Sequence, residues 1–346
     1  MTIRPNILIT GASGFIGGHI VRHFAEKDIN VFCLVRENSK LDFINDLPVH
    51  FIEGEITNLA SLINAFKGKD FIIHTAARSK DWGKWDAFYQ ANVTGTLNVL
   101  RAARENGINN VIITGSISSY GEENSDKIKD ENSPENPHYP YFLDRVFPSG
   151  MNYYRDSKTM ATLQSMAYAA ENQINLTVIE PVWVYGENEF SSGFYEYLKT
   201  VKSGMRIMPG SRKNNFHVVY AGDLAEAYYR VFELKLSGLN RIIIGNELPD
   251  KMYRIFNLFC KEAGLKQPVR MSRAMIYPIA FLLELALHIL NPNKPALLSR
   301  ARVNMFYDNI GYDTGKAERL IQFKANTPLE KGVSKTVNWY KQHQYL

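Results

Sequence analysis

Residues 10–20 read TGASGFIGGHI, and this stretch decides the fold. It directly follows the β-branched run NILIT (residues 6–10) and opens a segment whose apolar residues recur at helical spacing. Gly11, Gly14 and Gly17 fit the tight turn, the close backbone approach and the close packing of helix on strand that a pyrophosphate group requires. A glycine pattern between a strand and a helix at this place predicts a dinucleotide site.

Short apolar runs alternate with helical patterns through the first half of the chain. We expect strands over residues 6–10, 29–35, 49–54, 70–76, 110–116 and 176–181. Strands that are apolar on both faces and separated by crossover helices indicate an α/β fold with a doubly wound parallel sheet, the Rossmann fold. We therefore predict two domains, the second one smaller and mostly helical. They are a dinucleotide-binding domain over 1–181 plus about 216–236, and a substrate-binding domain over 182–215 plus about 237–346.

Composition narrows the class of protein. The formal net charge is +5, but the basic residues are scattered rather than massed, so we expect no nucleic-acid partner. The two cysteines, Cys33 and Cys260, have no CxxC spacing and no metal-ligand partners, which predicts a reduced, cytoplasmic protein without a metal site. A strand pattern occupies residues 6–10, where the apolar part of a signal peptide would begin.

The most apolar stretch is MIYPIAFLLELALHIL, residues 275–290. Pro278, Glu284 and His288 interrupt it, and it is shorter than the about 20 residues that span a bilayer. We interpret it as an amphipathic or buried helix of the second domain. The alternative is a peripheral membrane contact through 275–290.

The end of the second expected strand bears on the choice between NAD and NADP. An acidic residue there would bind the ribose 2′-hydroxyl of NAD, but this chain has Val35 followed by Arg36. Arg36 can clamp a 2′-phosphate, with Lys40 as a second cation, so NADP(H) is favoured over NAD(H). Glu37 leaves the NAD interpretation open.

The stretch MNYYRDSK, residues 151–158, carries the candidate catalytic pair. Tyr154 and Lys158 are four positions apart at the start of an expected helix and therefore share one face. The ammonium favours the phenolate and lowers the tyrosine pKa toward the working range. Tyr153 points about 100° away and has Ser157, not a lysine, four residues on. Ser116, at the carboxyl end of the fifth strand, is best placed to hold a substrate oxygen beside Tyr154.

These features together resemble the extended short-chain dehydrogenases/reductases, within the NAD(P)-dependent epimerase/dehydratase and 3β-hydroxysteroid dehydrogenase group. The motifs that carry the resemblance are TGASGFIG (10–17), HTAA (74–77), NVTGTLNV (92–99), TGSISSYG (114–121), YRDSK (154–158), EPVWVYG (180–186) and FHVVYAGDLAEA (216–227). The likeness extends over essentially the whole chain.

The resemblance implies roles for individual residues. Catalysis falls on Ser116, Tyr154 and Lys158, with Asn92 forming the water or backbone link behind Lys158. The cofactor-binding residues that it implies are Gly11, Ser13, Gly14, Phe15, Ile16, Gly17, Arg36, Lys40, Glu55, Ile56, Thr75, Ala76, Ala77, Tyr154, Lys158, Pro181 and Val184. It also implies a homodimer.

Two departures from the family pattern are informative. Ile117 and Ser118 follow Ser116, where 4,6-dehydratases carry an acidic pair, so dehydration is disfavoured. Glu180-Pro181 replaces the usual Arg-Pro, which removes any substrate role of that arginine. The second strand ends in Val-Arg, as in the reductase and steroid-dehydrogenase branch. We therefore expect hydride transfer between a nicotinamide and a secondary alcohol or ketone. The alternatives are a nucleotide-sugar epimerase with tightly bound NAD and a non-catalytic dinucleotide sensor.

Overall fold

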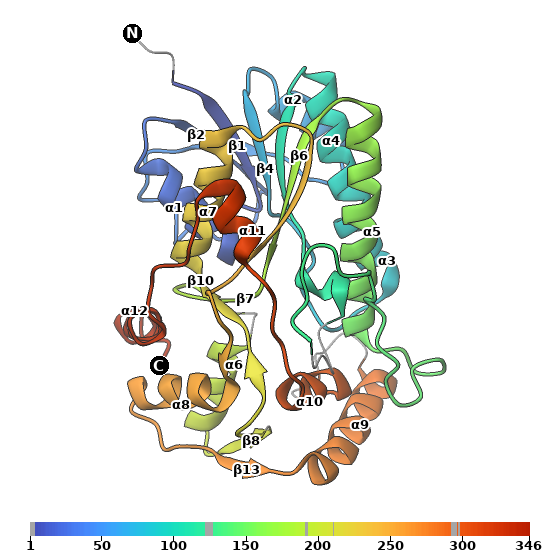
Figure 1. Cartoon of the computed structure of the whole chain (residues 1–346), viewed down its shortest axis with the longest axis vertical. Coiled ribbons are helices and arrows are strands. Elements are labelled where there is room, and N and C mark those ends of the chain that lie inside the picture. The colour runs from blue at the N-terminus through green and yellow to red at the C-terminus, as the bar shows by residue number, and fades with distance from the viewer. Residues whose placement is uncertain (1–3, 122–126, 191–192, 210, 292–295, 297) are drawn as a thin grey trace.

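A seven-stranded parallel sheet forms the centre of the protein in the computed structural model (Figure 1). The structure describes residues 4–121, 127–190, 193–209, 211–291, 296 and 298–346. The strand order is β11-β6-β5-β4-β1-β2-β3, so the direction of winding reverses between β1 and β4. The strands are β1 (Asn6–Thr10), β2 (Asn30–Val35), β3 (His50–Glu53), β4 (Phe71–His74), β5 (Asn110–Thr114), β6 (Asn175–Pro181) and β11 (Leu239–Ile244).

Helices cover both faces of the sheet because the strands bury side chains on both. Ile7 and Ile9 point into an apolar core shared with α1 and α7, whereas Leu8 between them points into the core shared with α2, α4 and α5. This confirms the doubly wound Rossmann sheet. The covering helices are α1 (Phe15–Ala25), α7 (Ala221–Leu234), α2 (Leu59–Ala65), α4 (Gly95–Glu105) and α5 (Gly150–Glu171). Short helical segments precede α4 and follow β5, namely α3 (Trp85–Phe88), the π-helix η1 (Tyr89–Thr94) and the 3-10 helix η2 (Ile117–Tyr120).

One edge strand corrects the expected domain boundary. β11 pairs in parallel with β6, from Leu239 beside Leu176 to Ile244 beside Pro181. The assignment of everything after about residue 237 to the second domain is therefore wrong for this strand. Only its last three residues, Ile242–Ile244, are both apolar and buried, so its sequence gives a weak strand pattern. The backbone pairing with β6 stabilises the strand despite this weak pattern.

The remaining elements, apart from α11, form a smaller lobe at the carboxyl ends of the strands (Figure 1). Its strands make three short pairs, which are β7 (Trp183–Tyr185) with β10 (Val218–Tyr220), β8 (Ile207–Pro209) with β13 (Val269–Met271), and β9 (Asn215–Phe216) with β12 (Asp250–Lys251). Its helices are α6 (Phe194–Lys202), α8 (Met252–Glu262), α9 (Arg273–Leu290), α10 (Arg300–Tyr307) and α12 (Leu329–Gln342). The helix α11 (Gly315–Ile321) returns to the sheet and packs on β11 and α7 (Figure 1). One apolar core contains both Ile9 of the sheet and Phe259 of α8, so the two lobes are packed together.

Candidate active site

The turn between β1 and α1 is shaped for a dinucleotide. Gly11 has φ +71°, and a Cβ there would lie 2.6 Å from the backbone nitrogen of Ala76. A Cβ on Gly17 would lie 2.1 Å from the carbonyl oxygen of Gly11. The N-cap of α1, Gly14, provides no side-chain hydrogen bond to the first turn of the helix. This glycine cradle with an uncapped helix N-terminus fits a pyrophosphate group.

The other expected cofactor residues lie at the ends of neighbouring strands. Thr75 follows β4 and donates a hydrogen bond from its hydroxyl to the carbonyl of Thr10 at 2.8 Å, which places Ala76 and Ala77 next to the turn. Ile56 packs against Gly95 of α4. Among the remaining expected residues, Glu55, Arg36 and Lys40 are exposed, Pro181 ends β6 and Val184 lies in β7.

Ser116, Tyr154 and Lys158 converge at the carboxyl end of β5. The Tyr154 hydroxyl donates to Ser116 Oγ at 3.4 Å. Ser118 also donates to Ser116 Oγ, from its hydroxyl at 2.7 Å and from its backbone nitrogen at 3.2 Å. Lys158 Nζ donates to the carbonyl of Thr114, the last residue of β5, at 2.5 Å. Tyr154 thus lies beside Ser116, and Lys158, one turn further along α5, is held at the end of β5.

Lys158 carries its charge in a poorly solvated position. Only 5% of the residue is exposed, and burial lowers its pKa to about 8, while the carboxylate of Glu180 opposes this shift. An ammonium with a pKa near neutrality gives up its proton readily. The protonation state of Lys158 therefore depends on its burial and on the nearby Glu180 carboxylate.

His74 is a buried polar residue beside this site that the sequence analysis did not single out. Its Nδ1 lies 2.7 Å from the hydroxyl of Thr10 and its Nε2 lies 3.0 Å from the hydroxyl of Thr96. Thr96 donates its own proton to the carbonyl of Asn92, so Nε2 must carry the imidazole hydrogen and Nδ1 must accept from Thr10. Burial, and then the charge of Lys158, lower the pKa of His74 to about 3, which keeps the ring neutral. The sequence signal that could have identified His74 is a histidine at the end of an apolar strand, in the motif HTAA.

Asn92 lies in the π-helix η1 and holds the backbone near the catalytic helix. Its Oδ1 accepts from the backbone nitrogen of Arg78 at 2.7 Å, and its Nδ2 donates to the Ser157 hydroxyl at 2.9 Å. Asn92 thus reaches the neighbour of Lys158 in the chain. Tyr153 is directed elsewhere and packs on Trp85, with 5.8 Å between ring centroids.

Comparison with known proteins gives the family. A model of the NAD dependent epimerase/dehydratase family matches residues 7–245, more than half of the chain. The chain belongs to this family. It is thus an enzyme of the extended short-chain dehydrogenase/reductase type, whose cofactor is a nicotinamide dinucleotide.

Individual relatives span reductases and epimerases. The chain is 30% identical over 228 residues to N-acetyl-alpha-D-glucosaminyl-diphospho-ditrans,octacis-undecaprenol 4-epimerase of Escherichia coli O157:H7, and the match covers 65% of this chain and 62% of that protein. It is 24% identical to 2-alkyl-3-oxoalkanoate reductase of Shewanella oneidensis, over 94% of this chain and 84% of the relative. The crystal structure of gox2253 has the same fold, with a TM-score of 0.80, 23% identity, and coverage of 99% of this chain and 100% of that one.

In this member of the epimerase/dehydratase family, Glu180 of the Glu-Pro pair is fully buried in an ionic cluster. Its carboxylate accepts from the Tyr120 hydroxyl at 2.6 Å and from Arg241 of β11 at 2.8 Å. Arg241 also pairs with Glu135 at 2.6 Å. Burial raises the pKa of Glu180, and Arg241 opposes that shift. The acidic replacement therefore joins β6, β11 and the segment after η2.

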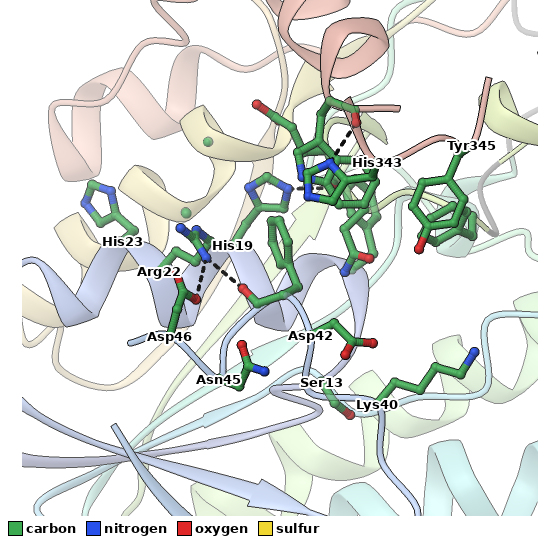
Figure 2. A pocket seen from close by; sticks show the side chains of 18 of the residues that line it. Ser13, His19, Arg22, His23, Lys40, Asp42, Asn45, Asp46, His343 and Tyr345 are labelled. Atoms are coloured by element: carbon green, nitrogen blue, oxygen red, sulfur yellow. Dashed lines mark hydrogen bonds and ion pairs between the residues drawn. The ribbon is translucent and has the colours of Figure 1, made fainter. Parts of the chain in front are cut away.

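A groove of about 990 Å³ opens beside the nucleotide turn, between α1, the segment after β2, and α12 (Figure 2). Ser13, Phe15 and Lys40 line it, but Ser116, Tyr154 and Lys158 are not among its described lining residues. His19 on its wall donates from Nε2 to the carbonyl of Glu187 at 2.8 Å, and burial lowers the His19 pKa. The groove thus adjoins the cofactor end of the site. Its lining comes from segments far apart in the chain, which no local pattern reveals.

Proposed function

We propose that this enzyme interconverts a secondary alcohol and a ketone with a nicotinamide dinucleotide. The observation that carries the proposal is the contact of the Tyr154 hydroxyl with Ser116 Oγ at 3.4 Å, one helical turn from the buried ammonium of Lys158. All three groups stand at the sheet edge that carries the glycine turn. The reductase relative, whose name describes reduction of a 3-oxoalkanoate, supports this reaction class.

The roles follow from the hydrogen bonds. Ser116 Oγ accepts from Ser118, so its own hydrogen is available to a substrate oxygen and stabilises negative charge there. Tyr154 takes the proton from the substrate hydroxyl, or returns it to the ketone oxygen. Lys158 supplies positive charge that favours the Tyr154 phenolate. The glycine turn would hold the dinucleotide, which would supply the acceptor or donor of the hydride when bound.

Substitution of Tyr154 tests the proposal. Tyr154→Phe should lower kcat by about 10²- to 10⁴-fold, because it removes the proton-transfer group, while the Kd of the dinucleotide stays unchanged. The matched control is Tyr153→Phe, which loses only a hydroxyl on a ring packed against Trp85 and should keep wild-type activity. The assay follows nicotinamide absorbance with a panel of aliphatic and cyclic ketones. Full activity of Tyr154→Phe would refute the assignment.

For the cofactor we propose NADP(H) in preference to NAD(H). Arg36 is the first residue after β2 and is exposed, with Lys40 four residues on. Arg36→Ala should raise the Kd of NADPH about tenfold through loss of charge-assisted hydrogen bonds to the 2′-phosphate, and leave the Kd of NADH unchanged. Calorimetry measures both Kd values. If Arg36→Ala changed the Kd of NADPH and of NADH equally, the preference would be contradicted, and Glu37 would become the candidate that binds the ribose of NAD.

Nucleotide-sugar epimerisation is the second candidate, favoured by the 30% identity to a 4-epimerase. It uses the same three side chains but retains its cofactor through the cycle. NAD(H) that co-purifies with the protein and gives no net reduction of added cofactor would support it. The non-catalytic sensor is set aside, because the chain belongs to a family of enzymes and retains Ser116, Tyr154 and Lys158. We also propose a homodimer, which light scattering on the purified protein tests.

A further inference from the structure

Helix α9 turns its apolar side outward. Met275, Ile279, Leu282, Ile289 and Leu290 recur at helical spacing, and their exposed fractions lie between 49% and 82%. Only 11% of this 18-residue helix is buried, and its mean hydropathy is 1.6. Of the two expected forms, an amphipathic or a buried helix, the buried one is therefore wrong and the amphipathic one agrees with the structure.

The polar side of α9 faces the protein instead. Glu284 pairs with Arg300 of α10 at 2.9 Å, and Arg300 is fully buried. Arg273 donates to Asn304 of α10 at 2.6 Å and pairs with Asp308 at 3.4 Å. These contacts determine which face is turned inward, because burying an unpaired charge would cost far more than exposing a leucine.

A neighbouring loop adds to the same surface. Phe142, Leu143 and Val146 are 57%, 50% and 84% exposed. The Phe142 ring packs edge-on against Phe281 of α9, with 5.2 Å between centroids. Arg300 donates to the carbonyl of Phe142 and, at 2.8 Å, to that of Phe147, so it holds the loop against α9. We call the exposed side chains of α9 and this loop the apolar platform. Its members are Phe142, Leu143, Val146, Met275, Ile279, Leu282, Leu283, Ile289 and Leu290.

We propose that the apolar platform docks on the surface of an anionic lipid bilayer, with α9 lying in the plane of the interface. Charge around the platform fits an anionic surface, because the exposed charged residues of 142–146 and 264–290 are all basic, namely Arg145, Lys266 and Arg270. The exposed stripe is aliphatic apart from Phe142, whereas protein interfaces concentrate Tyr, Trp and Arg at their centres. Its 18 residues extend about 27 Å, and one side is bound to α10, which suits a helix lying on a membrane rather than one crossing it.

The position of the platform relates it to the catalytic helix. The loop that contains Val146 leads directly into α5 through its N-cap, Ser149, and α5 carries Tyr154 and Lys158. In Figure 1, α9 and α10 lie beneath the lower end of α5. Docking would therefore hold that end of the catalytic helix near the lipid surface. The proposal stands on the platform alone and does not depend on the reaction.

Vesicle co-sedimentation of the full chain tests the proposal. The protein should partition onto vesicles of phosphatidylcholine with phosphatidylglycerol, and more weakly onto phosphatidylcholine alone or at high salt. Leu282→Glu should lower the partition coefficient about tenfold, because it replaces an inserted side chain with a charge. The matched control is Leu248→Glu, which alters a leucine that is 72% exposed and lies outside the platform.

Each other outcome counts against the proposal. Absence of vesicle binding by the wild type, or an equal loss in both variants, would overturn it. A dimer that Leu282→Glu converts to a monomer, without vesicle binding, would assign the platform to a second copy of the chain. Reductase activity toward a water-soluble ketone should be unchanged in Leu282→Glu. The vesicle test of the apolar platform is therefore independent of the Tyr154→Phe test of the proposed reaction.

Discussion

Substitution of Glu180 probes the buried ionic cluster between β6 and β11. Glu180→Gln removes the charge of a fully buried carboxylate while keeping the shape of the side chain. Arg241, only 10% exposed, then loses the negative charge of its partner at 2.8 Å but keeps Glu135 at 2.6 Å. We expect the variant to fold with β11 less firmly held on β6.

The magnitude follows from what remains around Arg241. Removal of one member of a buried ion pair typically costs about 3–5 kcal/mol, because the other charge stays desolvated. Glu135 still compensates part of the Arg241 charge, so we expect a loss near 3 kcal/mol in the free energy of unfolding. The double variant Glu180→Met with Arg241→Met removes both charges and should recover at least half of this loss.

Urea unfolding followed by circular dichroism measures the effect. The matched control is Glu318→Gln, which breaks the pair with Lys324 at 3.0 Å, where both side chains are about half exposed. That change should cost less than about 1 kcal/mol. A Glu180→Gln loss no larger than that of the control would refute the reasoning, because the cluster would then behave as a solvated surface pair.

Two further substitutions address the glycine turn and the buried Lys158. Gly17→Ala brings a Cβ within 2.1 Å of the Gly11 carbonyl oxygen and should raise the Kd of the dinucleotide at least about tenfold, as measured by calorimetry. The matched control is Gly311→Ala, whose added Cβ lies 3.5 Å from the Pro249 side chain and should leave that Kd unchanged. The lowered pKa of Lys158, about 8 against 10.5 for an ordinary lysine, means that the unfolded chain binds more protons over that interval, so stability rises with pH there. Lys158→Met should remove about 3 kcal/mol of this rise in the free energy of unfolding between pH 8 and pH 10.5. Urea titrations at several pH values measure the dependence of that free energy on pH, and a dependence equal to that of the wild type would contradict the prediction.

Much of the sheet could be predicted because its strands carry their own signal. The runs 7–9 and 111–113 are apolar and flanked by polar residues, so the expected strand 6–10 agrees with β1, and the expected strand 110–116 agrees with β5 except for its last two residues. β11 was not predicted because Arg241 interrupts its apolar pattern. The charge of Arg241 is compensated by Glu180, which is distant in the sequence. A buried pair across two strands leaves no local trace.

The site was predictable to the extent that spacing determines geometry. The four-residue interval predicted that Tyr154 and Lys158 share one face, and the position of Ser116 at the carboxyl end of the fifth strand predicted that it lies beside Tyr154. The tautomer of His74 depends on the single proton of Thr96, which only the contact reveals. Likewise, periodicity shows that α9 has two faces, but Arg300 decides which one is buried.

The path of the chain between the lobes bears on how the protein is made. After β6 the chain leaves the sheet, returns as α7 and β11, and leaves again before α11 packs on β11. No single cut therefore yields a free-standing lobe. During synthesis, β6 remains an open edge until Leu239–Ile244 emerges from the ribosome. A nascent chain stalled before Leu239 presents a template for pairing with other chains, so the interleaved path makes completion of the sheet a vulnerable step.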